Sequence, residues 1–139
     1  MHHKRPKGFS LVELLTVVAI VGVLAAVAYP SYQNNARKTK LEDGKGALSE
    51  LAKAIQRRYT QRIPNTYAGN ATGGADTGTP DGSLLPPAST RVTFNFNIDA
   101  ATATSFTVSA TAVAGANIDP ACTTITYTNA GVGSPAACW

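Results

Sequence analysis

The chain has 139 residues, 14% of them charged, and a formal net charge of +4. This length predicts one domain. The positive charge would suit a nucleic-acid partner, but Lys4, Arg5 and Lys7 all precede the first apolar segment, so the rest of the chain is nearly neutral. The sequence contains no metal-binding, phosphate-loop or dinucleotide motif, and His2 and His3 lie among the first residues. We therefore expect no metal, no cofactor and no enzymatic activity.

A continuous apolar segment runs from Phe9 to Tyr29, and Glu13 is its only charged residue. As an α-helix, a segment of this length spans about 30 Å, which matches the hydrocarbon core of a bilayer. One interpretation is a secretory signal peptide with its cleavage site at Ala26–Ala28. A second is a plain membrane anchor. A third is a membrane helix that is processed at its start and then packs against identical helices.

The first two interpretations leave features of this segment unexplained. The apolar segment is longer than the usual core of a signal peptide, and a carboxylate inside it is unexpected. In a plain anchor Glu13 has no role, although a charge in a membrane helix is costly. Cleavage of the Gly8–Phe9 bond would instead create an α-amino group on Phe9 and make Glu13 the fifth residue of the mature chain. Pairing of that amine with Glu13 of a neighbouring helix would fix their axial register, because a buried unpaired carboxylate is strongly destabilising.

In residues Lys7–Glu13, Gly8 precedes the aromatic Phe9, and Glu13 is the fifth residue counted from Phe9. This pattern resembles the prepilin leader motif of type IV pilins and pseudopilins. The resemblance implies cleavage by a prepilin peptidase after Gly8, N-methylation of Phe9, and Glu13 as the assembly residue. It also implies other pilin subunits and an inner-membrane assembly platform as partners. Gly22 and Pro30 fall where pilin helices are commonly weakened, although Gly22 would equally suit a close contact between helices.

An amphipathic helix is predicted to continue from Ser31 to about Tyr59, within residues 31–60. Its apolar residues recur at three- and four-residue spacing and would pack on a small sheet. They are Leu41, Ala47, Leu48, Leu51, Ala52, Ile55 and Tyr59. Gly44 and Gly46 interrupt this pattern, and each should weaken the helix by about 1 kcal/mol relative to Ala.

Residues 61–90 are rich in Gly, Thr, Pro, Asn and Asp and predict a long loop. Three segments of alternating apolar and polar residues follow, which predicts an antiparallel sheet. They are Arg91–Ile98, Ser105–Ala112 and Thr123–Asn129. In the first, Val92, Phe94, Phe96 and Ile98 are expected to share the apolar face.

Cys122 and Cys138 are the only cysteines. An even count without neighbouring metal ligands favours a disulfide, which persists in oxidising compartments such as the periplasm; two free thiols are the alternative. The charges flanking the apolar segment are nearly balanced, because Arg37, Lys38 and Lys40 follow it. The cysteines therefore decide the expected orientation, with the C-terminal part in the periplasm.

Arg57, Arg58, Arg62 and Arg91 are candidate contacts to DNA or to a partner protein. Some minor pilins bind DNA during uptake, but basic clusters more often form a solvated surface or meet headgroups and neighbouring subunits. DNA is therefore the less favoured partner.

Further segments resemble the PilE-like group of minor pilins: Tyr29–Gln33, Phe106–Ala110, Asp119–Cys122, Gly131 and Cys138–Trp139. The resemblance implies an α+β type IV pilin fold, in which a long N-terminal helix with a transmembrane first half packs on three or four antiparallel strands with a C-terminal disulfide loop. The expected divisions are a leader (1–8), a transmembrane assembly helix (9–30) and a periplasmic domain (31–139), with its sheet in 91–139.

The implied function is that of a minor pilin, held in the inner membrane before assembly and in a surface pilus afterwards. Such a subunit would serve pilus biogenesis, adhesion, twitching motility or DNA uptake. The alternatives are a major pilin, a DNA-binding competence pilin and a pseudopilin of type II secretion.

Overall fold

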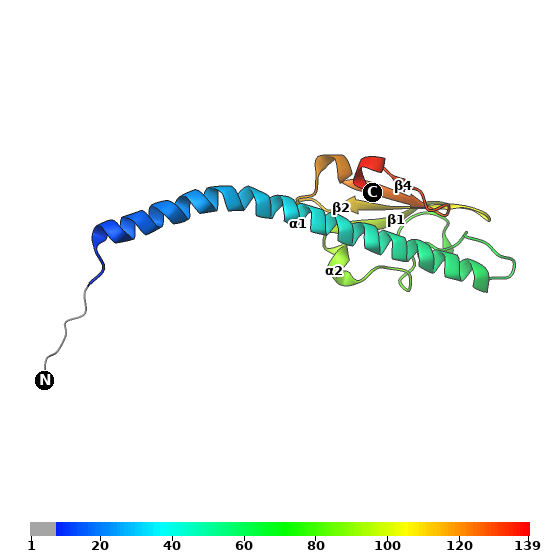
Figure 1. Cartoon of the computed structure of the whole chain (residues 1–139). Coiled ribbons are helices and arrows are strands. Elements are labelled where there is room, and N and C mark those ends of the chain that lie inside the picture. Colours follow the sequence, from blue (N-terminus) through cyan, green and yellow to red (C-terminus); the bar gives the residue numbers. More distant parts are fainter. Residues whose placement is uncertain (1–7) are drawn as a thin grey trace, which may run out of the picture. The chain divides into compact units, whose positions relative to one another are not determined.

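The computed structural model describes residues 8–139, so the basic residues of the expected leader lie outside the described residues. Helix α1 spans Leu11–Gln61 and contains Pro30. A short helix, α2 (Ala88–Arg91), precedes the strands β1 (Phe94–Ala101), β2 (Phe106–Ala112), β3 (Thr124–Thr128) and β4 (Gly133–Ser134) (Figure 1). The chain divides into two compact units, one ending at Ala36 and the other spanning Arg37–Trp139, which are described separately.

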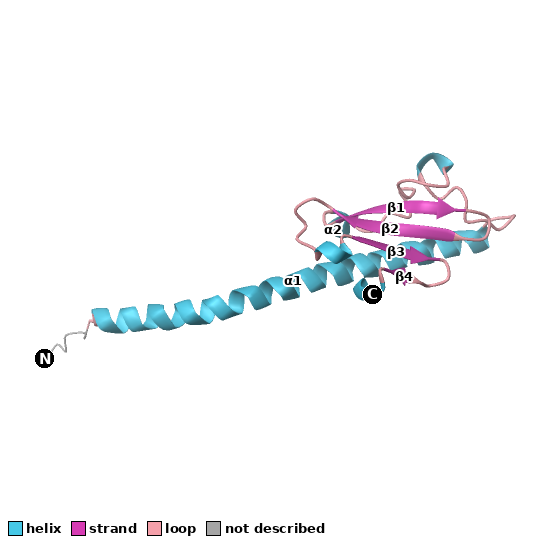
Figure 2. Ribbon diagram, turned by 90° about the horizontal axis from the view of Figure 1, so that it is seen from above, coloured by secondary structure: helices cyan, strands magenta, loops and turns pink. Residues whose placement is uncertain are grey.

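The four strands form one antiparallel sheet in the order β1-β2-β3-β4 (Figure 2). Phe96 pairs with Ala110, and Val108 pairs with Tyr127. Successive residues of a strand point to opposite faces, so Phe94, Phe96 and Ile98 are buried whereas Asn95 and Asp99 are exposed. The prediction of a small antiparallel sheet is confirmed, as is the apolar face of each predicted strand apart from the start of the first.

The hydrophobic core lies within Arg37–Trp139, between the apolar stripe of α1 and one face of the sheet. The helix contributes Ala47, Leu48, Leu51, Ala52 and Ile55, and the sheet contributes Phe94, Ile98, Phe106, Val108, Ala110 and Ile125. Fully burying one such large side chain contributes about 1.5–3 kcal/mol. The predicted stripe is therefore confirmed, with Leu41 and Tyr59 only half-buried at its two ends.

The first strand begins later than its alternating pattern predicts. Arg91 is the last residue of α2, and the chain becomes extended only at Phe94 and remains so to Ala101. The expectation that Val92 joins the apolar face is wrong, because its side chain is 74% exposed. The physical reason is local: Val92 keeps a helical backbone (φ −73°, ψ −19°) after the turn of α2, so strand periodicity does not yet apply to it.

Gly44 is a buried residue of α1 on the side that faces β1, and its packing role was not predicted from the sequence. A Cβ atom at this position would lie 2.5 Å from Cε2 of Phe94, whose side chain is fully buried. Gly44 therefore allows the aromatic ring to pack directly on the helix backbone. Gly46 lies two residues further along, and an added Cβ there would meet open space.

Candidate functional site

Phe9 and the first part of α1 present an apolar surface that nothing among residues 8–139 covers. Phe9 is 81% exposed, and Leu24 and Val27 are also largely exposed. An 18-residue window of this helix has a mean hydropathy of 2.6 and no buried residue. By length and composition the helix can cross a membrane, and an apolar surface of this extent requires lipid or other helices around it.

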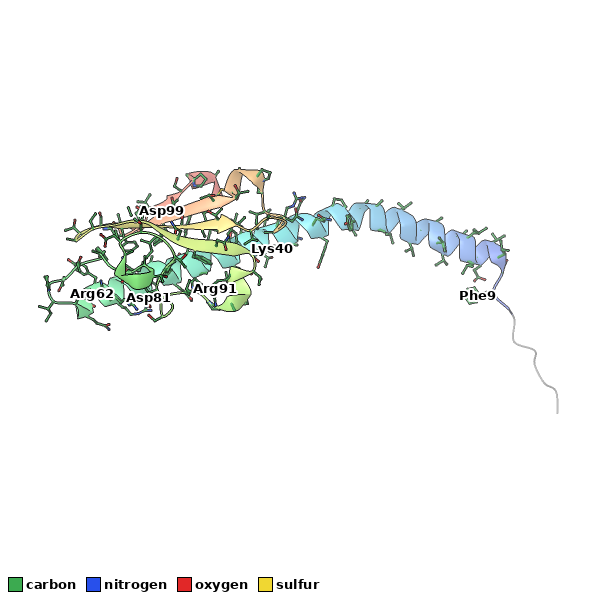
Figure 3. The ribbon with its side chains drawn as sticks, turned by 180° about the vertical axis from the view of Figure 1, so that it is seen from behind. Phe9, Lys40, Arg62, Asp81, Arg91 and Asp99 are labelled. Atoms are coloured by element: carbon green, nitrogen blue, oxygen red, sulfur yellow. A yellow bond between two sulfur atoms is a disulfide. The ribbon has the colours of Figure 1, made fainter. Side chains whose placement is uncertain are left out.

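Glu13 lies in the first turn of α1 and is the only charged residue between Gly8 and Ala36. The helix dipole favours a carboxylate in this turn. Because residues 8–36 contain no basic side chain, a full countercharge must come from outside this segment. Phe9, the predicted first residue after cleavage, lies just ahead of the helix (Figure 3).

Gly22 and Pro30 both lie inside α1. A Cβ atom on Gly22 would meet nothing within 4 Å among residues 8–139, so packing within this part of the chain does not require a glycine there. Pro30 lacks the N–H that would bond the carbonyl of Ala26, and this leaves a weak point in the hydrogen bonding of the helix. Their roles in assembly remain predictions.

Arg58 joins α1 to the loop that follows it. Its guanidinium lies 3.2 Å from Oδ1 of Asp81 and 3.5 Å from Oδ1 of Asn70, and it also donates to the Ser83 hydroxyl. The backbone N–H and hydroxyl of Ser83 both donate to Asp81. These two hydrogen bonds, followed by the one from Arg58, lower the pKa of the Asp81 carboxyl below its ordinary value of 3.8.

We predict that Asp81→Asn lowers the thermal unfolding midpoint at neutral pH but has little effect in acid. A carboxyl whose pKa is depressed in the folded state stabilises the fold above pH 3.8, and this contribution disappears as the pH falls through the folded-state pKa. Unfolding curves of wild type and variant at pH 7 and at successively lower pH should therefore converge below pH 3.8. A gap of constant size across this range would contradict the prediction.

The four candidate arginines differ in whether their guanidinium groups are engaged within the fold. Arg58 is engaged as described, and Arg62 donates to the carbonyls of Ala68 and Gly69, so these two fold the loop onto the helix. The guanidinium groups of Arg57 and Arg91 have no hydrogen-bond or ion-pair partner among residues 8–139. They line different hollows: Arg57 faces residues 83–87, whereas Arg91 lies beside β1.

Two further basic residues have roles that sequence reasoning missed. Lys40 donates to the carbonyl of Ala116 at 2.9 Å, and Arg37 donates to the Asn117 side chain at 2.9 Å. Both anchor the segment between β2 and β3 to the helix. Lys40 lies at the opposite end of the Arg37–Trp139 unit from Arg62 (Figure 3). Nothing in the spacing of these residues distinguishes them from solvated lysines and arginines.

The predicted disulfide is present between Cys122 and Cys138, with a Cα–Cα distance of 5.7 Å and both cysteines buried. It ties the turn before β3 to the turn after β4. Nearby, the Tyr127 and Trp139 rings stack with centroids 5.1 Å apart. The indole of Trp139 lies so close to Gly133 that there is no room for a side chain there. The disulfide and the stacked rings together therefore hold the end of the sheet.

A long N-terminal helix with an apolar first part, a four-stranded antiparallel sheet on its second part and a C-terminal disulfide define the type IV pilin fold, a class of structural proteins. Residues 30–126 match the family model described as type IV minor pilin ComP, DNA uptake sequence receptor. Residues 3–29 match the prokaryotic N-terminal methylation motif. The chain belongs to this ComP family of type IV minor pilins.

Similar curated proteins include several pilins. The chain is 43% identical over 53 residues to a fimbrial protein of Pseudomonas aeruginosa, covering 38% of this chain and 34% of the relative. It is 42% identical over 50 residues to the type IV major fimbrial protein FimA of Dichelobacter nodosus, covering 36% and 32%. A fimbrial protein of Neisseria meningitidis is 39% identical over 70 residues, covering 48% and 41%.

These matches cover about a third of the length of the first two relatives. No solved structure matches the chain significantly.

Proposed function

We propose that this protein is a minor subunit of a type IV pilus, held in the inner membrane before assembly and then packed with other pilin subunits through the apolar part of α1. The observation that carries the proposal is the exposed apolar first part of α1, whose only charge is Glu13. In lipid or in a bundle of helices such a carboxylate is costly unless it finds a positive partner. The match to the N-terminal methylation motif supports the proposal that this positive partner is a newly formed N-terminus.

The partner that we propose is the amine of Phe9, released when a prepilin peptidase cleaves the Gly8–Phe9 bond and methylated afterwards. An amine and a carboxylate separated by about one turn of helix can pair between adjacent subunits only when the helices are correctly staggered. Gly22 and Pro30 would supply flexibility to this helix during assembly. The leader would then be 1–8, the assembly helix 9–30 and the exported domain 31–139.

The proposed orientation places the exported domain in the periplasm. Support comes from the buried Cys122–Cys138 disulfide, because disulfides form and persist in that compartment and are rare in the cytosol. An inner-membrane assembly platform would then draw the processed subunit into the filament.

Glu13→Ala should be processed normally but should enter filaments poorly, because one half of the proposed ion pair is missing. The measurement is the amount of the variant in sheared filaments relative to membranes, with intact mass used to identify the mature N-terminus. Glu50→Ala is the matched control, since it removes an exposed carboxylate elsewhere on α1. Its incorporation should equal that of wild type.

Two results would contradict this proposal. A mature chain that begins at Tyr29 would show cleavage by a signal peptidase and remove the helix from the filament. Normal incorporation of Glu13→Ala would remove the register argument. The abundance of the wild-type protein in sheared filaments distinguishes a minor from a major subunit, and its recovery only with a type II secretion system would indicate a pseudopilin.

DNA uptake is the more specific function that the family supports. The family model that covers residues 30–126 is named for a DNA uptake sequence receptor. Arg57 and Arg91 are exposed, and within residues 8–139 neither guanidinium has a partner, so both are free to meet phosphates. We propose that the Arg37–Trp139 unit binds double-stranded DNA and that these two side chains supply part of the phosphate contacts.

The DNA proposal predicts a specific salt dependence. Full-length protein in detergent micelles should bind a fluorescent DNA duplex with an affinity that falls as salt rises. Arg57→Gln and Arg91→Gln should each reduce the slope by about 1, because each removes one positive charge from a phosphate. Thr90→Ala, a neutral change in α2, is the control. Unchanged affinity and slope in both arginine variants would remove these residues from the DNA-binding surface.

A further inference from the structure

The outer edge of β1 has hydrogen-bonding groups that the fold leaves unpaired. The N–H and C=O of Ile98 bond to Gly78 at 2.8 and 2.9 Å, away from β2. Alternate residues of a strand direct these groups to the same side, so those of Phe96 and Phe94 also point outward. Among residues 8–139 they have no backbone partner. Figure 2 shows β1 as the outermost strand of the sheet.

The loop that pairs with Ile98 stops short of the rest of this edge for a clear reason. Gly78 and Ile98 form a single antiparallel bridge. If the ladder continued, the next residue to exchange hydrogen bonds with β1 would be Pro80, opposite Phe96. Proline has no N–H to donate, and Pro80 instead forms a bridge with Ala71. The ladder therefore ends after one pair, and the edge at Phe94 and Phe96 stays open.

A hollow of about 370 Å³ lies beside this open edge, lined by Thr79, Leu85, Arg91, Phe94, Asn95 and Phe96. Thr79 and Leu85 belong to the loop that precedes α2, and Arg91 is the last residue of α2. Its guanidinium is free of ion pairs within residues 8–139. The hollow thus combines an unpaired strand edge, an apolar wall at Leu85 and one positive charge.

We propose that this edge binds an extended peptide segment of another protein, which adds to β1 as an antiparallel strand and places a carboxylate against Arg91. Main-chain hydrogen bonds to Phe94 and Phe96 would supply affinity, and alternate side chains would supply specificity. Side chains opposite Phe94 and Phe96 share the core-side face and should be apolar. Because the added strand runs opposite to β1, its C-terminal end approaches Arg91, and the acidic residue belongs there.

A second copy of this chain is a poor occupant of the same edge. Pairing β1 with another β1 around Asn95 would place residue 92 of the second copy opposite Ile98. That edge of Ile98 is already taken by Gly78, and the second copy would bring its own α2 into the same space. The edge therefore suits a free strand without flanking structure.

The test uses isotope-labelled full-length protein in detergent micelles and the peptide acetyl-VTVTD-amide, followed by amide chemical shifts and hydrogen exchange. Addition of the peptide should protect the amides of Phe94 and Phe96. The peptide ending in Asn, and the original peptide with Arg91→Gln protein, should each bind about two- to fivefold more weakly, as expected for loss of an exposed ion pair. A peptide N-methylated at both Val residues cannot pair and should not bind.

Four outcomes would overturn the proposal. One is the absence of protection at Phe94 and Phe96 at millimolar peptide, and another is equal binding of the N-methylated peptide. The third is equal binding of the Asp and Asn peptides, which would remove the assigned ligand chemistry. Protection that appears without peptide as protein concentration rises would assign the edge to a second copy of the chain instead. Arg91→Gln changes an exposed side chain, so its fold should be retained.

Discussion

Replacement of Cys122 and Cys138 together by Ala should lower the free energy of unfolding by about 3 kcal/mol, because the disulfide closes a loop with a sequence separation of 16. The covalent link restricts the unfolded chain, and its loss leaves the turn after β4 held to the sheet mainly by the stacked Tyr127 and Trp139 rings. Urea unfolding of residues 37–139, which contain all the buried residues among 8–139, measures the effect. For a small core this loss is a large part of the total stability.

The reduced wild-type protein is the matched control for this double variant. It breaks the same bond but keeps both sulfur atoms, which lie in a buried environment. If loop closure dominates, reduction and double substitution should have similar effects. A double variant as stable as the oxidised wild type would show that packing around the two turns holds the end of the sheet without the covalent bond.

Periodicity alone predicted most of the fold. The spacing of Leu48, Leu51 and Ile55 selects one face of a helix, and the alternation of Phe106, Val108 and Ala110 selects one face of a strand. These two apolar surfaces cover each other within Arg37–Trp139, and loop residues such as Leu84 complete the core. The antiparallel order follows from the short connections between strands.

Predictions failed where a residue depends on its local backbone or on a distant partner. Val92 continues the alternating pattern of β1, but the preceding turn of α2 keeps it helical and exposed. Arg58 and Arg62 looked like surface cations, yet each folds the loop after α1 by donating to groups within it. Charge and spacing in the sequence do not reveal which arginines find acceptors nearby. Of the four candidates, Arg57 and Arg91 are the two whose guanidinium groups have no partner among residues 8–139.

The main features of the candidate site on the assembly helix could be predicted from the sequence, but the geometry of the site could not. An exposed apolar surface and a lone carboxylate at Glu13 are visible in the sequence and in the fold. The proposed partner of Glu13 is created only by a cleavage and lies on another subunit. The chemistry of the pair can therefore be predicted from one chain, whereas its geometry belongs to the filament.

Gly44→Ala should lower the free energy of unfolding of residues 37–139 by about 1–2 kcal/mol, although Ala is the better helix former. The added Cβ would lie 2.5 Å from Cε2 of Phe94, and the ring is fully buried and cannot move aside freely. Gly46→Ala is the matched control, because its Cβ meets open space. It should stabilise the unit by about 0.5–1 kcal/mol through helix propensity alone.

Because both changes are the same substitution two residues apart on one helix, the propensity contribution is common to them. The difference between their unfolding free energies, measured by urea titration, therefore reports the clash with Phe94. Phe94→Leu should be less destabilising in the Gly44→Ala background than in wild type, since a smaller side chain leaves room for the new methyl group. A double-mutant cycle should give a coupling energy of about 0.5–3 kcal/mol. If the two substitutions were simply additive, Gly44 would be a general helix-weakening residue, and the close packing of β1 on the helix would need another cause.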